Sequence, residues 1–328
     1  MVSIFKSNAP QSNLFLFAYA LLLKFPTFIH PVVSAPIPTD DLLYRWTYQL
    51  INTIGSSFPL IFSLLVFVIY FIQAVMLNAL VNNQRLFHKP TYLTGMTFLL
   101  VTSMFPAWYA FSAPLLSSFL LLLMLQGICS LYNNPSPKST LFNLGLYIGL
   151  SALFYFPSVV FTLLLLSGLT IARPFRMAEW LIMLLGAITP YYFVWSYLYI
   201  SGHSLDIIQP TFVIGKSVLL GAGIHNAAVV LILFSLLVGF FFIQSNMRRL
   251  LVQSRKTWSI LYLCLLLALV VPFLNHQPSF LYWELAALPL AVFIASVFLY
   301  PDYSWFPVVL HWAFFFVVAF QGYLLVVH

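Results

Sequence analysis

Two adjacent carboxylates are the side chains best placed to do chemistry in this sequence. Asp40 and Asp41 follow the stretch Pro36-Ile37-Pro38 and precede the run LLYRWTYQLINTI. A carboxylate in such a loop can act as a general base that takes a proton from an acceptor or positions it for attack. Arg45, one helical turn later, can meet a lipid phosphate or pair with Asp41. Both acidic residues equally suit a first helical turn, whose free N–H groups favour carboxylates.

The composition places these residues in a membrane protein. Of 328 residues, 62% are hydrophobic and 6% are charged. Thirteen basic and six acidic residues cannot form the charged surface that a soluble protein of this length needs. The sequence therefore predicts one all-α, polytopic membrane domain over residues 1–328. It excludes soluble enzymes and a nucleic-acid partner, and no metal or other cofactor is expected.

The apolar segments predict about eleven membrane-spanning helices. The stretch 141–171 is the hardest to divide, because one helix of that length would be about 47 Å long, well beyond the hydrocarbon core. Gly145, Gly149 and Pro157 offer places to bend it, which favours two short helices. The predicted spans are approximately 12–30, 59–81, 91–106, 114–132, 141–156, 157–172, 179–200, 222–243, 258–274, 281–299 and 305–327.

The basic residues predict the orientation of these spans. Loops on the cytoplasmic side of a membrane protein carry the excess of Lys and Arg. With the N-terminus inside and the C-terminus outside, ten of the thirteen basic residues lie inside, whereas Arg45 and Lys216 lie outside and Lys24 lies near the outer end of the first span. We expect a multi-pass protein of the bacterial inner membrane, with outer loops over 31–58 and 201–221.

The first outer loop contains a segment with a helical apolar stripe. An amphipathic helix is predicted over 41–54, lying in the outer interface with Trp46 at the depth of the lipid headgroups. Thr39 is the expected N-cap, which places the acidic pair in the first turn. The stripe consists of Leu42, Leu43, Trp46, Leu50, Ile51 and Ile54.

Other ionisable residues also fall at outer ends. Glu284 lies near the outer end of an apolar segment, and His276 precedes it by a few residues. An ionisable group within a membrane segment is a candidate functional residue, because its burial costs several kcal/mol unless it is paired. Glu284 can instead remain hydrated at the interface or pair with Arg45 or a histidine. His203 and Lys216 occupy the second outer loop, where a solvated loop also accounts for them.

The order of these elements resembles the GT-C superfamily of membrane glycosyltransferases. The stretch FNLGLYIGLSALFYFPSVVFTLLLLSG, residues 142–168, is similar to the glycine-bearing helix pair of those enzymes. The resemblance implies a polyprenyl-phosphate sugar as donor and Asp40 or Asp41 as catalytic base, assisted by His276 or Glu284. Arg45, Lys216 and His203 would then bind substrate or its phosphate.

The chain also resembles an uncharacterised family of polytopic bacterial inner-membrane proteins, which implies no activity, so the sequence leaves open whether this is an enzyme. One alternative is a non-catalytic subunit that scaffolds a secretion or envelope-assembly complex with a protein partner. Another is a transporter of lipid or a small solute, for which Glu284 and His311 are the candidate residues within the membrane. In each case membrane lipid is an expected partner.

Overall fold

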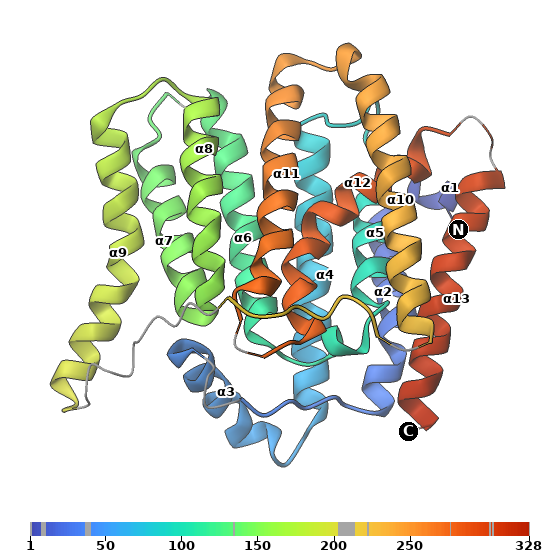
Figure 1. The fold of residues 1–328 in the computed structure, drawn as a ribbon, viewed down its shortest axis with the longest axis horizontal. Helices are drawn as coiled ribbons and strands as arrows, with labels where there is room; N and C mark the ends of the chain where they lie inside the picture. The colour runs from blue at the N-terminus through green and yellow to red at the C-terminus, as the bar shows by residue number, and fades with distance from the viewer. Residues whose placement is uncertain are drawn as a thin grey trace.

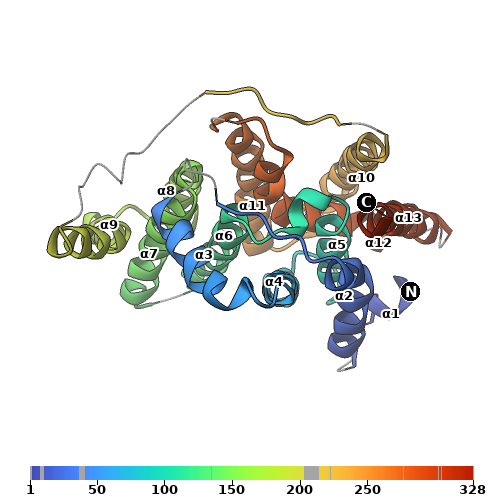
Figure 2. The same ribbon diagram turned by 90° about the horizontal axis from the view of Figure 1, so that it is seen from below.

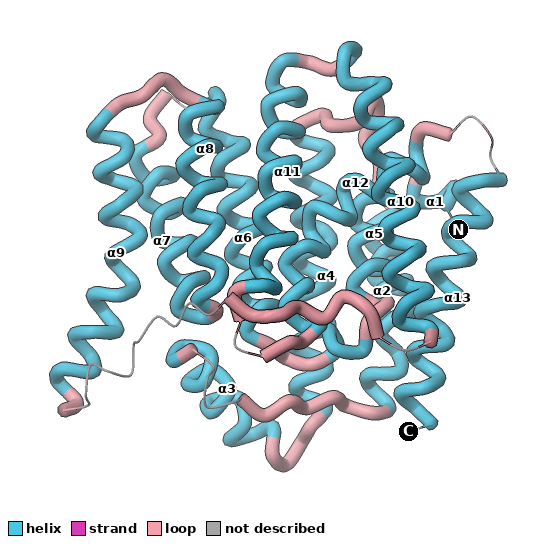
Figure 3. The backbone as a smooth tube through the Cα atoms, viewed as in Figure 1, coloured by secondary structure: helices cyan, strands magenta, loops and turns pink. Residues whose placement is uncertain are grey.

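The computed structural model describes residues 2–7, 11–36, 41–133, 135–202, 214–221, 223–275, 277–301, 303 and 305–327. Every regular element within these ranges is a helix (Figure 1, Figure 3). Eight helical segments there are long and apolar enough to cross a membrane, as expected of a polytopic helical membrane protein. They are α2 (Ser12–Ile29), α4 (Leu60–Asn83), α6 (Ala113–Ser130), α9 (Met177–Ile200), α10 with η5 (Ile224–Arg249), α11 with η6 (Val252–Phe273), η7 with α12 (Phe280–Leu299) and α13 (Trp305–Val327).

Two helices at the centre form the core of the molecule. Helix α5 (Leu93–Thr102) packs against α12 (Ala287–Leu299), and every residue of both helices is buried. Helix α4 covers α5, and α10 covers α12. Because protein encloses α5, its backbone can end well short of a full span and continue through η1 (Pro106–Tyr109) without exposing polar groups to lipid.

The apolar stretch from 141 to 171 forms two helices. Helix α7 (Lys138–Phe154) ends where Tyr155 adopts an extended conformation, and η3 (Phe156–Phe161) leads into α8 (Thr162–Ala172). The expected role of Gly145 and Gly149 was wrong, because both lie inside α7 and not at a bend. A Cβ on Gly145 would collide with the carbonyl of Met183 in α9, so these glycines allow close helix packing.

The predicted amphipathic helix is α3 (Leu42–Gly55), which lies across one end of the bundle (Figure 1, Figure 2). It begins at Leu42 with Asp41 as N-cap, so Asp41 precedes the first turn and does not lie within it. The expected N-cap, Thr39, lies outside the described residues. Segments 31–36 and 214–221 run across the same end of the bundle (Figure 3).

The loops at the opposite end of the bundle carry most of the basic side chains. The connections between α4 and α5, between α6 and α7, between α8 and α9, and between α10 and α11 all lie there (Figure 1). The short helices η2 (Leu131–Asn133) and η5 (Met247–Arg249) belong to this end, and α1 (Val2–Phe5) packs against α5 and α13.

Candidate functional site

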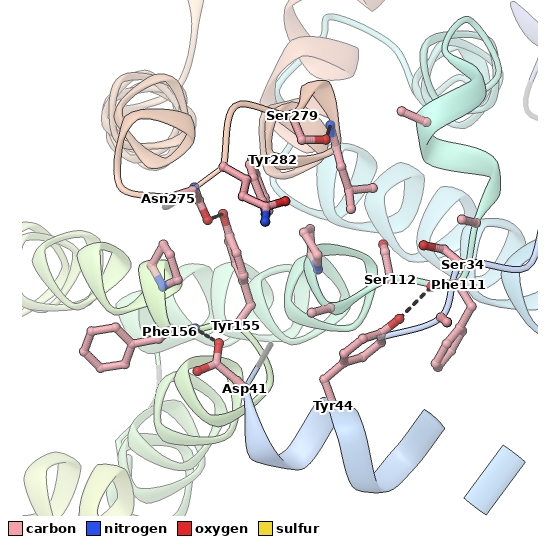
Figure 4. Close-up of a pocket in the computed structure, with 18 of the residues that line it drawn as sticks. Ser34, Asp41, Tyr44, Phe111, Ser112, Tyr155, Phe156, Asn275, Ser279 and Tyr282 are labelled. Atoms are coloured by element: carbon pink, nitrogen blue, oxygen red, sulfur yellow. Dashed lines mark hydrogen bonds between the residues drawn. The ribbon is translucent and has the colours of Figure 1, made fainter. Parts of the chain in front are cut away.

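A cavity of about 370 Å³ opens at the end of the bundle that α3 covers (Figure 4). We call it the α3 cavity. Its wall includes one carboxylate, several hydroxyls, amides and aromatic rings, contributed by segments that are distant in the sequence. The polar and aromatic side chains used below are Asp41, Tyr44, Ser112, Tyr155, Asn275 and Tyr282.

Asp41 joins the start of α3 to the start of η3. Its Oδ2 accepts a hydrogen bond of 2.7 Å from the backbone N–H of Phe156 (Figure 4). The side chain makes no capping bond within α3 itself. The carboxylate therefore reaches from α3 to the α7–η3 turn, where it lines the cavity.

Tyr155 and Tyr282 form an aromatic wall of the α3 cavity. Their rings stack with centroids 5.8 Å apart and planes 9° from parallel. The Tyr155 hydroxyl donates to Asn275 Oδ1 at 2.9 Å, and Asn275 Nδ2 donates to the Val271 carbonyl at 2.9 Å. These contacts join Tyr155, at the turn between α7 and η3, to the segment that precedes η7.

Ser112 connects the cavity wall to Glu284 in the interior. The Ser112 hydroxyl donates to Glu284 Oε2 at 3.0 Å and accepts from the backbone N–H of Leu115 at 3.2 Å, which makes it the N-cap of α6. Glu284 is 1% exposed, and its side chain does not line the cavity. Burial contradicts the alternative in which Glu284 stays hydrated at the interface, and within the described residues its hydrogen-bond partners are Ser112 and Tyr70 instead of Arg45.

Near Glu284, buried side chains donate hydrogen bonds to backbone carbonyls at and after the end of α5. The Tyr70 hydroxyl lies 2.6 Å from Glu284 Oε1 and 3.0 Å from the Trp108 carbonyl. The buried Lys24 ammonium donates to the Thr102 carbonyl at 2.7 Å and lies over the Tyr70 ring, 4.4 Å from its centroid. A cation at the C-terminus of a helix is favourable, and non-helical backbone at membrane depth needs such partners.

The structure brings two of the predicted site residues to this region. Asp41 lines the α3 cavity, and Glu284 lies directly behind Ser112. Arg45 and Lys216 lie at the same end of the bundle, but neither lines the cavity, and Lys216 is exposed. The Arg45 Nε is buried with no hydrogen-bond partner in the described part of the chain. The other three predicted residues, Asp40, His203 and His276, lie outside the described residues.

Sequence reasoning missed several polar residues of this region. Lys24 could have been identified from the sequence, because a lysine inside an apolar run is a candidate functional group. No sequence pattern identifies Tyr155, Asn275 and Ser112, because they come together only when α6, α7 and the segment before η7 pack against one another. In the described ranges, no group of three His, Cys, Asp or Glu side chains lies close enough to hold a metal ion.

Comparisons with models of protein families, with curated proteins and with solved structures found no match for this chain. The proposed function therefore rests on the residues and the geometry of the α3 cavity.

Proposed function

We propose that this protein is a membrane glycosyltransferase with a GT-C-like fold, which transfers a sugar from a polyprenyl-phosphate carrier to an acceptor at the outer face. The observation that supports the proposal is the position of the Asp41 carboxylate in the wall of the α3 cavity, at one end of the helix bundle. The predicted resemblance to membrane glycosyltransferases assigns the base to this position or to Asp40.

In the proposed reaction, Asp41 takes the proton of an acceptor hydroxyl as its oxygen attacks the anomeric carbon of the donor sugar. The bond between that carbon and the phosphate oxygen breaks, and polyprenyl phosphate leaves with the electron pair. A carboxylate held by the Phe156 N–H has a fixed orientation, and this orientation lowers the entropic cost of the proton transfer.

The remaining cavity side chains suit a sugar. The partly exposed ring of Tyr282 can pack against a pyranose ring, and the side chains of Ser112 and Asn275 offer hydrogen-bonding groups to its hydroxyls. No Lys or Arg is among the described residues of the wall. We therefore assign the donor phosphate to a position outside the cavity, toward Arg45 or Lys216 at the same end.

The proposal includes an orientation in the membrane. We infer eleven passes, a cytoplasmic N-terminus and a periplasmic C-terminus, in a bacterial inner membrane. This inference is supported by the basic loops that lie at the end opposite α3 (Figure 1). In this orientation the α3 cavity faces the periplasm, where polyprenyl-linked sugars are used.

Ligand binding tests the proposal without knowledge of the acceptor. The purified protein in detergent is heated with polyprenyl-phosphate sugars or with polyprenyl phosphate alone, and the thermal midpoint is measured. A ligand that binds the folded state raises the midpoint. We expect the sugar-bearing carrier to raise it more than the bare carrier, and this difference to disappear in Asn275→Ala. Equal shifts for both carriers with every sugar tested would contradict sugar recognition.

Two alternatives make different predictions. The transporter interpretation stays a prediction and requires a cavity that reaches both faces beside Glu284 or His311; neither residue is in the wall of the five cavities described for this chain. His311 instead lies 2.9 Å from the Tyr19 hydroxyl in the interior. The scaffold interpretation stays a prediction and requires a partner chain that co-purifies in fixed stoichiometry.

A further inference from the structure

The loop between α4 and α5 forms cavities at the end of the bundle opposite the α3 cavity. One cavity of about 350 Å³ is lined by Asn82, Arg85, His88 and Lys89, among others. A second, of about 380 Å³, is lined by Gln84, Arg85 and Gln253, among others. Arg85, an exposed residue, belongs to both walls.

This loop is held in place from both sides. The Asn82 side chain donates to the Thr91 carbonyl at 3.0 Å and accepts from the Thr91 N–H at 3.1 Å, which closes the loop at its base. From α11, the Ser254 hydroxyl lies 2.9 Å from the Gln84 carbonyl and 3.0 Å from the Arg85 carbonyl. Hydrogen bonds from two helices thus fix the loop backbone, which distinguishes it from an ordinary surface turn.

Arg85 adopts a backbone conformation that L-residues avoid. Its φ is +48°, and it is the one non-glycine residue with positive φ in the described chain. This conformation is unfavourable for a residue that has a Cβ, and glycine adopts it without that cost. Arg85 ends α4 in this conformation, with the Leu86 N–H bonded to the Val81 carbonyl at 3.1 Å, at a position that glycine usually fills. The presence of arginine here suggests a use for its guanidinium.

Positive charge gathers around Arg85 without a described carboxylate to neutralise it. His88 and Lys89 line the same cavity, and in the described part of the chain the ion pairs are those of Arg173 and Arg176 with Glu179. Burial and then the charge of Lys89 lower the pKa of His88, and the same two causes lower the pKa of Lys6. The cavity therefore has two cations, Arg85 and Lys89, beside a His88 that its lowered pKa keeps neutral at physiological pH, and an anion would be stabilised there.

We propose that Arg85, His88 and Lys89 bind the phosphate group of an anionic phospholipid. A guanidinium forms paired hydrogen bonds with phosphate oxygens, and the adjacent amides of Asn82 and Gln84 add neutral hydrogen-bonding groups. The source is a lipid because the loop begins directly after the membrane-spanning α4, at the depth where headgroups lie. This inference is independent of the proposed transferase function.

Lipid titration of the delipidated full-length protein tests the site. The probe is phosphatidylglycerol in mixed micelles, with binding followed by native mass spectrometry. We expect saturable binding that Arg85→Gly weakens at least tenfold, because glycine keeps the backbone conformation and removes the guanidinium. Arg249→Gln is the matched control, since it removes one exposed charge at the same end outside both cavities. Its binding should stay within twofold of the unmodified protein.

Three results would overturn the assignment. Unchanged binding in Arg85→Gly would remove its basis, and an equal loss in Arg249→Gln would indicate diffuse surface charge. Displacement of the lipid by an equal concentration of soluble glycerol phosphate would make this a site for free phosphate instead. Lys89→Gln gives a second test in the same cavity, with an expected loss of about threefold. Retention of the unfolding midpoint in each variant ensures that the comparison reports binding.

Discussion

The hydroxyl of Tyr70 and a carboxylate oxygen of Glu284 lie 2.6 Å apart, although 214 residues separate them in the sequence. This contact joins α4 to η7 in the interior of the bundle. Through Ser112, the same carboxylate reaches the wall of the α3 cavity. The position of the cavity wall therefore depends on a buried polar contact that two distant segments must form.

Loss of the Tyr70 hydroxyl should destabilise the protein. In Tyr70→Phe, Glu284 and the Trp108 carbonyl each lose a buried partner. An unsatisfied buried polar group costs about 1–3 kcal/mol, so we expect a loss of that size in the free energy of unfolding. Denaturant titration in mixed micelles measures it. Tyr323→Phe, at an exposed position in α13, is the control and should be neutral. Equal stability of both variants would rule out a structural role for the Tyr70 contact.

Replacement of Ser112 by alanine should affect both α6 and Glu284. The substitution removes the N-cap of α6 and one hydrogen bond to the carboxylate. Loss of an N-cap costs about 1 kcal/mol, and the unsatisfied carboxylate oxygen adds to this. We expect a decrease of about 2 kcal/mol in the free energy of unfolding, against almost none for Ser130→Ala, an exposed position at the end of the same helix. A loss no larger than that of the control would show that Ser112 is dispensable.

The packing of α7 against α9 should tolerate no side chain at Gly186. An added Cβ would collide with the Phe142 carbonyl, so Gly186→Ala must push the two helices apart. Overpacking of this kind costs about 1–3 kcal/mol, which outweighs the gain in helix propensity. Thermal unfolding should show a clearly lowered midpoint for Gly186→Ala and little change for Thr170→Ala, which is exposed on α8. A raised midpoint in Gly186→Ala would contradict the close crossing.

Cysteine labelling in intact cells tests the proposed orientation. Both native cysteines are buried, so a membrane-impermeant thiol reagent should report mainly on introduced positions. We expect Lys216→Cys to react from the outside and Arg249→Cys to react only after the membrane is permeabilised. The opposite pattern would place the α3 cavity on the cytoplasmic side.

The sequence predicted the helical class and the α3 helix, because both depend on local patterns of apolar residues. It also predicted two helices over 141–171. The predicted bend at Gly145 was wrong, because glycine is favoured both at bends and where helices pack closely, and here it serves close packing. The sequence could not predict the wall of the α3 cavity. Asp41 contacts Phe156, and Tyr155 contacts Asn275, only because α3, α7 and the segment before η7 meet in space.

The most direct test of the proposed function measures the release of polyprenyl phosphate from polyprenyl-phosphate sugars. The unmodified protein and Asp41→Asn are compared in proteoliposomes, with a membrane extract as the source of acceptor. Asparagine still accepts the Phe156 N–H but cannot take a proton, so the fold is kept while the base is lost. We expect turnover by the unmodified protein and a loss of at least 100-fold in Asp41→Asn at an unchanged unfolding midpoint. Equal turnover by the two proteins would contradict the role of Asp41 and, with it, the proposed mechanism.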